Sequence, residues 1–166
     1  RTWNKKLPGV GIKEINGTES LYKAFEEINK AGKPCRLVIL GDMSSAPELK
    51  QYRDGQFGHL ITELGAYNAG GATHLRVLGG ADILCLPSYP CETYRLYDRF
   101  KTIEYLAAGK RILAADTQIN REIIQDSGIY FDEGSFKSMA DSAVEYKENS
   151  VYIEESNIKV LEQYNW

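Results

Sequence analysis

The sequence predicts an α/β domain of three layers, with a parallel sheet of about six strands and helices on both faces. Short apolar runs alternate along the chain with segments of helical period, which is typical of parallel strands joined by crossover helices. The runs LVIL and DILCL are apolar throughout, as in strands that are covered on both faces. The length of 166 residues and the hydrophobic fraction of 43% are ordinary for one globular domain with one core.

Six short, mostly apolar runs are expected to form the strands of this sheet. Each run is followed or preceded by a segment with helical spacing, so the connections between strands are expected to be helices. The predicted strands are Pro8–Ile12, Cys35–Leu40, His59–Leu64, Asp82–Leu86, Arg111–Ala115 and Gly128–Phe131.

The segment TESLYKAFEEINKAG predicts a long helix between the first two strands. Thr18 is a suitable N-cap, and Gly32 is a suitable stop. Its apolar residues recur at helical spacing, so one face is expected to be buried. These residues are Leu21, Ala24, Phe25 and Ile28.

Further helices are predicted in the segments that separate the later strands. The fourth of them has Thr117 or Asn120 near its start and Gly128 at its end, and the third ends on Gly109. The segments are APELKQYRD, AGGATHLRVLGGA, KTIEYLAAG, NREIIQDSG, SFKSMADSAVEYKEN and VYIEESNIKVLEQY.

Composition and charge argue against several classes of function. A net charge of −3 provides no field that attracts nucleic acid or an anionic membrane. The longest apolar runs are too short to span a bilayer, and the N-terminal stretch lacks the apolar core of a signal peptide. Because the chain begins with Arg1 rather than Met, we expect it to be part of a longer protein.

The cysteines and histidines favour a metal-free protein in a reducing compartment. An odd count of three cysteines without CxxC spacing indicates free thiols, which favours the cytoplasm. Cys85 lies in a predicted strand and is expected in the core, whereas Cys91 lies in a predicted loop and is the candidate reactive thiol. His59 and His74 are far apart in the sequence, which argues against a zinc site.

The stretch FKTIEYLAAGKRILAAD is the strongest candidate for a binding site. In open α/β sheets, ligands bind at the carboxyl ends of the strands, beside helix N-termini. A helix that begins near Arg99–Thr102 offers free N–H groups and a positive dipole to a phosphate, and Arg99 and Lys101 add charge. Glu104 is placed to accept hydrogen bonds from a vicinal diol such as a ribose. Alternatively, Glu104 only complements the helix dipole and Lys101 is a solvated surface charge.

Three weaker signals lie at the ends of other predicted strands. GVGIKEINGTES does not match the dinucleotide fingerprint GxGxxG, although Gly11 would allow a ligand to approach the backbone closely. Gly41 follows the strand LVIL and suggests a similar close approach. Tyr89, Tyr94 and Tyr97 in the long loop after DILCL either stack on a ring or pack the loop against the domain.

Taken together, these stretches resemble the C-terminal domain of the group 1 (family 4) retaining glycosyltransferases of the GT-B fold. Members commonly read A-D-x-x-x-x-P-S and then E-x-x-A-x-G-K-P-V-x-A. The resemblance covers nearly the whole chain, from about residue 9 to residue 166. It is carried by LVILGD, GGADILCLPS, KTIEYLAAGKRILAAD and NREIIQDSGIYFDEG.

The resemblance implies that the chain binds a nucleotide-diphosphate sugar, such as a UDP- or GDP-hexose. Glu104 would correspond to the glutamate that binds the ribose hydroxyls, Gly41 would line the nucleotide, and Leu64 and Gly65 would lie where the base is read. The family uses no bound metal or cofactor, so cationic side chains and helix N-termini must neutralise the leaving diphosphate. The residues expected beside the diphosphate are Arg99, Lys101 and Thr102.

Two departures from the family pattern concern catalysis more than nucleotide binding. The family usually has a second glutamate in the spacing E-x7-E, but Leu96 stands at that distance before Glu104. Either Glu92 or Asp98 takes its place, or the loop follows the variant pattern with a basic residue and K-x-x-E-Y, which RFKTIEY resembles.

Members of the family also usually have an Arg after the glycine of the first strand and a Lys before the glycine that opens the first helix. Near those positions this chain has Ile12 or Lys13, and Asn16. Lys13 is the candidate substitute, whereas INGTESL lacks the usual Lys.

The resemblance further implies that residues 1–166 are one Rossmann-like donor-binding domain from a two-domain hexosyltransferase. The other, N-terminal domain would supply the contacts to a glycan or lipid-linked acceptor, so the isolated chain is expected to have little or no transferase activity. The expected role is polysaccharide biosynthesis, in the cytoplasm or at the inner face of the membrane. The alternatives are a catalytically inactive nucleotide- or sugar-binding module of the same fold and a sugar-nucleotide epimerase, which would need a cluster of His or acidic residues.

Overall fold

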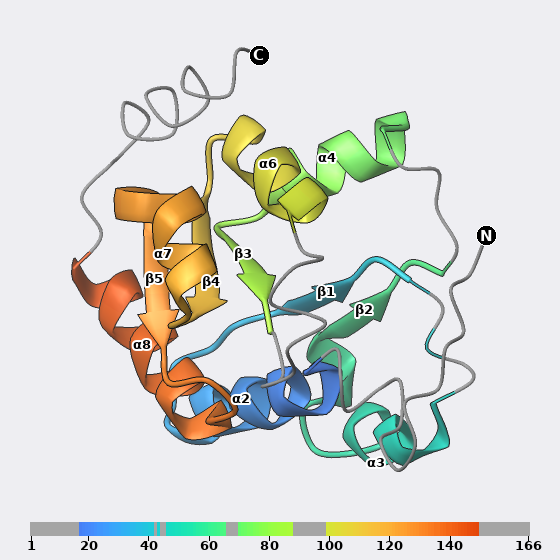
Figure 1. Ribbon diagram of the computed structural model, residues 1–166. Helices are drawn as coiled ribbons and strands as arrows, with labels where there is room; N and C mark the ends of the chain where they lie inside the picture. Colours follow the sequence, from blue (N-terminus) through green and yellow to red (C-terminus); the bar gives the residue numbers. More distant parts are fainter. Residues whose placement is uncertain (1–16, 42, 44–45, 66–69, 88–98, 150–166) are drawn as a thin grey trace, which may run out of the picture.

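The computed structural model describes residues 17–41, 43, 46–65, 70–87 and 99–149 (Figure 1). Within these ranges the strands form a two-stranded sheet in the order β1-β2 and a three-stranded sheet in the order β3-β4-β5. Neighbouring strands in both sheets are parallel, as the sequence predicts. The strands are β1 (Leu37–Ile39), β2 (Ile61–Glu63), β3 (Ile83–Leu86), β4 (Arg111–Ala115) and β5 (Gly128–Phe131).

The predicted single sheet of about six strands is therefore too large for the described part of the chain. The predicted strand Pro8–Ile12 lies outside the described residues. β1 begins later than expected because the backbone N–H of Cys35 donates to the Asn29 side chain instead of to a strand (3.2 Å). β2 begins only at Ile61 because the residues before it form a 3-10 turn, closed by a hydrogen bond from the Leu60 N–H to the Phe57 carbonyl (2.9 Å).

The helices follow the predicted segments, with small shifts at their ends. The last predicted segment, VYIEESNIKVLEQY, lies outside the described residues. The helices are α2 (Thr18–Lys30), α3 (Lys50–Arg53), α4 (Ala72–Gly80), α6 (Arg99–Ala107), α7 (Gln118–Ile124) and α8 (Phe136–Asn149), with 3-10 turns at Pro47–Leu49, Gly58–Leu60 and Gln125–Ser127.

Two of the predicted helix starts, those of α2 and α7, differ in outcome. The N-cap of α2 is Gly17 rather than Thr18, and Gly17 has a left-handed φ of 62° that a residue with a side chain adopts only at a cost. The start of α7 is confirmed, because the Thr117 hydroxyl accepts a hydrogen bond from the Asn120 N–H (3.2 Å).

The three layers are confirmed around β3, β4 and β5 (Figure 1). Alternate residues of β4 point to opposite faces: Ile112 and Ala114 pack with α6 and α7, whereas Leu113 and Ala115 pack with α2 and α8. The buried residues on the first face are Leu86, Leu106, Ile112, Ala114, Ile123 and Ile124, and those on the second are Ala24, Leu113, Ala115, Phe131, Met139 and Ala140. Cys85 packs against the second cluster, as expected for a core thiol.

A third cluster joins β1 and β2 to α2 and α3, and it depends on a buried tyrosine that the sequence pattern did not single out. Tyr22 has no exposed surface, and its hydroxyl donates to Glu63 at the end of β2 (2.7 Å). Arg53 on α3 donates to the other oxygen of Glu63 (3.2 Å). Burial, and secondly the hydrogen bond to Glu63, raise the pKa of Tyr22 above its usual value.

Tyr22→Phe is expected to lower the free energy of unfolding by about 1.5 to 3 kcal/mol, because it removes a partly buried hydrogen bond to a charged acceptor and keeps the ring. Urea denaturation measures the change. In a Glu63→Ala background the same substitution should cost clearly less. An equal cost in both backgrounds would mean that the hydroxyl does not act through Glu63.

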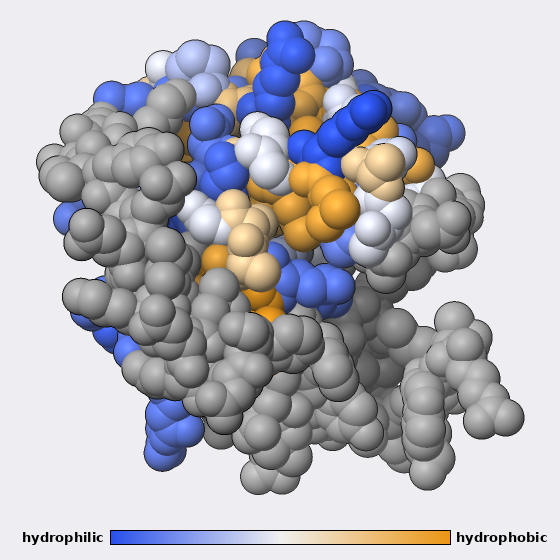
Figure 2. Space-filling view, turned by 90° about the horizontal axis from the view of Figure 1, so that it is seen from above, coloured by the Kyte–Doolittle hydropathy of each residue, from blue (hydrophilic) through white to orange (hydrophobic). Residues whose placement is uncertain are grey.

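The outer surface of the described part mixes polar and apolar side chains. The face seen from above Figure 1 shows hydrophobic residues among hydrophilic ones (Figure 2). Among the described residues, Leu75 on α4 is the most exposed large hydrophobic side chain, at 60%. No helix in the described ranges is long and apolar enough to cross a membrane.

Candidate functional site

The ends of β1 and β2 come together at two glycines. Gly41 and Gly65 form an isolated antiparallel bridge beyond the two strands, and the Leu64 N–H donates to the carbonyl of Ile39 (3.0 Å). The structure thus brings together Gly41, Leu64 and Gly65, which the sequence proposes for the nucleotide. A Cβ on Gly65 would meet no atom within 4 Å, so the backbone there faces open space. Leu64 is 40% exposed beside it.

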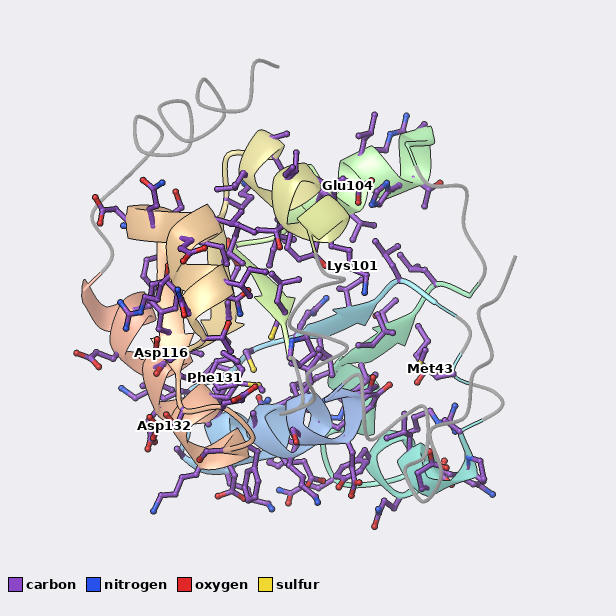
Figure 3. All side chains as sticks on the ribbon, viewed as in Figure 1. Met43, Lys101, Glu104, Asp116, Phe131 and Asp132 are labelled. Carbon is purple, nitrogen blue, oxygen red and sulfur yellow. The ribbon has the colours of Figure 1, made fainter. Side chains whose placement is uncertain are left out.

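Glu104 lies on α6, on the side that faces α4 (Figure 3). Its side chain is 43% exposed, so the carboxylate is accessible to a ligand. Lys101 lies one turn earlier on the same helix and is also exposed. Asp116 and Asp132 lie apart from this pair, at the ends of β4 and β5 (Figure 3).

A histidine that the sequence treats as isolated stands beside Glu104. His74 on α4 is only 4% exposed, and its Nε2 lies 3.9 Å from Oε2 of Glu104. Its Nδ1 accepts a hydrogen bond from the backbone N–H of Gly70 (2.9 Å). The helical pattern of AGGATHLRVLGGA placed His74 on a helix, but nothing in the sequence indicated which helix would pack against it.

The remaining predicted site residues are either buried, described without a side chain, or outside the described residues. Thr102 is 1% exposed, so its side chain is buried in the domain and only its backbone is left to face a ligand. Arg99 is the first residue of α6, but its side chain is not described. Outside the described residues lie Gly11, Lys13, Tyr89, Cys91, Glu92, Tyr94, Leu96, Tyr97 and Asp98.

The start of α2 packs against the end of β3. The first hydrogen bond of this helix runs from the Leu21 N–H to the Gly17 carbonyl (3.0 Å). A Cβ at position 17 would overlap the carbonyl oxygen of Pro87, the residue that follows β3. Gly17 is therefore required both by its positive φ and by this close approach. The contact fixes the start of α2 at the carboxyl end of the three-stranded sheet.

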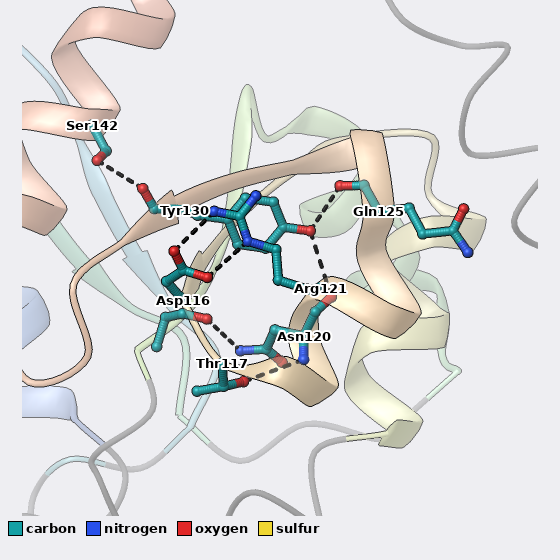
Figure 4. Close-up of polar contacts among 8 residues, drawn as sticks. Asp116, Thr117, Asn120, Arg121, Gln125, Tyr130 and Ser142 are labelled. Carbon is teal, nitrogen blue, oxygen red and sulfur yellow. Dashed lines mark hydrogen bonds and ion pairs between the residues drawn. The ribbon is translucent and has the colours of Figure 1, made fainter.

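Asp116, the acid that closes the stretch FKTIEYLAAGKRILAAD, is engaged by an arginine (Figure 4). Arg121 donates to both its oxygens, from Nε at 2.7 Å and from Nη2 at 2.8 Å. This pairing lowers the pKa of the Asp116 carboxyl. The guanidinium also lies 3.8 Å from the centre of the Tyr130 ring on β5. Asp116 therefore serves to hold α7 against the sheet.

Further hydrogen bonds complete this network around α7 (Figure 4). The Asn120 side chain donates to the carbonyl of Ala115 at the end of β4 (2.8 Å). The Tyr130 hydroxyl donates to the carbonyl of Gln125 (2.7 Å), and burial raises its pKa to about 12. These bonds join α7 to β4 and β5 at both of its ends.

Among the described residues, no group of three or more His, Cys, Asp or Glu side chains is placed to hold a metal ion. The arrangement instead offers one accessible carboxylate, a lysine one turn before it and a glycine-lined edge. Such groups bind a polar ligand by hydrogen bonds and charge.

Comparisons with known proteins agree with this architecture. The family described as glycosyl transferases group 1 matches residues 9–149. No curated protein matches the chain. A glycosyltransferase from Rickettsia africae ESF-5 is similar over 89% of this chain and 40% of its own, with 18% identity and a TM-score of 0.65. The Anabaena protein Alr3699/HepE, in complex with UDP, is similar over 90% of this chain and 41% of its own, with 17% identity and a TM-score of 0.62.

At such identities the two structures establish a common fold, and the chain spans about two fifths of the length of each. The family match covers most of the sequence, including Gly41, Gly65 and Glu104. The chain therefore belongs to the group 1 glycosyltransferases, and its fold is consistent with their C-terminal domain.

Proposed function

We propose that this chain is the donor-side domain of a retaining hexosyltransferase and binds a UDP- or GDP-linked hexose. The hexosyl unit would pass to a glycan or a lipid-linked acceptor held by an N-terminal domain of the same protein. The observation that carries the proposal is the position of Glu104, which is accessible on α6 with Lys101 one turn before it. The family of the chain supports the reaction class.

The ribose, the base and the diphosphate of a nucleotide sugar each have a chemical counterpart among these residues. The Glu104 carboxylate can accept two hydrogen bonds from the vicinal hydroxyls of a ribose, and charge makes these bonds strong. Leu64 is exposed beside the open backbone of Gly65, where a flat base can make apolar and backbone contacts. Gly41 lies next to Gly65 and completes that edge.

The diphosphate is assigned to the first turn of α6. The first N–H groups of a helix have no partner within the helix, and the dipole favours an anion there. Lys101 is exposed on that turn, and Arg99 begins it. Gly11 and Lys13, which lie outside the described residues, are also proposed to contact the donor. In this scheme the charge that develops on the leaving diphosphate is stabilised by cations and backbone N–H groups, and neither a metal nor a cofactor takes part.

Nucleotide binding by the purified chain tests the proposal directly. UDP or GDP at 100 times its dissociation constant should add about 2.7 kcal/mol to the free energy of unfolding, because only the folded state binds it. UDP is the first choice because HepE, which shares the fold, was crystallised with it. EDTA should leave the effect unchanged. ADP and NADH are the comparison nucleotides, and the proposal is overturned if neither UDP nor GDP raises the melting temperature above the level reached with them.

The alternative of a catalytically inactive nucleotide-binding module has one observation in its favour. Leu96 stands where the family usually has the first glutamate of E-x7-E. The two functions are separated by assaying the full-length protein with UDP- and GDP-hexoses and a set of glycan and lipid-linked acceptors. Transfer of a hexose supports the enzyme, and tight binding without transfer or donor hydrolysis supports the module. We place the enzyme in the cytoplasm or at the inner face of the membrane, in polysaccharide biosynthesis.

A further inference from the structure

A buried histidine lies behind the proposed ribose-binding carboxylate. His74 belongs to α4 and Glu104 to α6, and the two side chains meet where these helices face each other. The histidine is 4% exposed, whereas the glutamate is 43% exposed. A ligand from solvent can therefore reach Glu104 but not the imidazole, so His74 can influence the ligand only indirectly.

The hydrogen bond to Gly70 decides which nitrogen of His74 faces the carboxylate as a donor. The N–H of Gly70 donates to Nδ1 at 2.9 Å, so Nδ1 acts as an acceptor and carries no proton. The ring proton is then on Nε2, the nitrogen that lies 3.9 Å from Oε2 of Glu104. The backbone of Gly70 thus presents the N–H of the imidazole to the carboxylate.

From this geometry we infer that His74 is a positioning residue, which holds the Glu104 carboxylate in the orientation that accepts the two ribose hydroxyls. The inference rests on the proposed function. The separation of 3.9 Å is longer than a hydrogen bond, so the N–H attracts the carboxylate without closing on it and leaves its oxygens accessible. The imidazole is buried but the carboxylate is 43% exposed, so solvent screens part of this attraction.

The expected benefit is preorganisation. An exposed glutamate side chain samples several rotamers, and a ligand that binds one of them bears the entropy cost of fixing it. An N–H held at one position by the backbone favours the rotamers that face it. Removing this restraint should weaken nucleotide binding by about 3- to 10-fold, which is the cost of immobilising one flexible side chain.

Two substitutions separate the two contacts of the imidazole, the one with Gly70 and the one with Glu104. In His74→Asn the side-chain oxygen can still accept from Gly70, as Nδ1 does, but the side chain is too short to reach Glu104. In His74→Gln the amide nitrogen can reach the position of Nε2 and donate to Glu104, and the contact to Gly70 is lost. Melting temperatures and circular dichroism without ligand show whether each variant is folded.

The measurement is isothermal titration with UDP, or with GDP if that is the nucleotide the wild type binds. His74→Asn should raise the dissociation constant by about 3- to 10-fold, and His74→Gln should recover part of that loss. In a Glu104→Ala background, His74→Asn should have no further effect. The 2′,3′-dideoxy form of the same nucleotide lacks the hydroxyls, so its affinity should be equal for the wild type and both variants.

The outcomes distinguish a failure of the inference from a failure of the proposed function. If the wild type binds the nucleotide and Glu104→Ala weakens binding, but His74→Asn binds as the wild type does, the inference is wrong and the function stands. If the variants raise the dissociation constant of the dideoxy nucleotide by the same factor as that of the normal nucleotide, His74 only supports the fold, and the inference is wrong. If the wild type binds neither UDP nor GDP, the function and the inference are both overturned.

Discussion

Glu104→Ala is expected to weaken UDP binding by about 10- to 100-fold, because hydrogen bonds to a charged group contribute about 1.5 to 3 kcal/mol. The substitution removes both acceptors proposed for the ribose hydroxyls. It should leave the melting temperature without nucleotide nearly unchanged, since the Glu104 side chain is 43% exposed. Isothermal titration measures the affinity.

Asp141→Ala is the matched control for this substitution. It removes an exposed carboxylate from α8, on a different helix of the same domain, and should not change the affinity. Glu104→Gln keeps one oxygen acceptor and should fall between the wild type and Glu104→Ala. If Glu104→Ala and Asp141→Ala bind UDP equally well, Glu104 does not hold the ribose.

Gly17→Ala is expected to lower the free energy of unfolding by about 3 kcal/mol or more. A left-handed conformation costs a residue with a side chain about 1 to 2 kcal/mol, and the φ of Gly17 is 62°. The added methyl group would also overlap the carbonyl oxygen of Pro87, so the start of α2 must move away from β3. Urea denaturation measures the loss.

Gly32→Ala separates the two contributions. Gly32 has a φ of 73°, but a Cβ there would meet no atom within 4 Å. In this variant the free energy of unfolding should therefore fall only by the cost of the left-handed conformation, about 1 to 2 kcal/mol. The difference between the two alanine variants measures the contact with Pro87. Equal losses would contradict the close approach of α2 to the end of β3.

The sequence predicted the ends of those strands whose boundaries depend on residues in or next to the strand. β4 and β5 have the predicted ends, Arg111–Ala115 and Gly128–Phe131. β4 follows Gly109, whose positive φ ends the preceding helical segment. β1 and β2 are shorter than predicted because neighbouring side-chain and 3-10 hydrogen bonds take backbone groups that the apolar pattern assigned to strands.

The candidate site was predictable where the rules of parallel sheets apply. Gly41 and Gly65 each follow a strand, and carboxyl ends of parallel strands meet at one edge, so their contact could be expected. The contacts of Tyr22 with Glu63 and of His74 with Glu104 join distant parts of the chain. They depend on how helices pack on the sheet, which hydrophobic periodicity does not specify.

The anchoring of α4 has a consequence for how this sequence can change over time. His74 and Leu78 are the buried residues of the helix, and the other members of its nine-residue span are partly or fully exposed. One imidazole thus attaches α4 to the domain and also faces Glu104. In the proposed role of His74, selection for folding and selection for donor affinity would act on the same residue, so a replacement at position 74 that satisfies one requirement would need a compensating change elsewhere to satisfy the other.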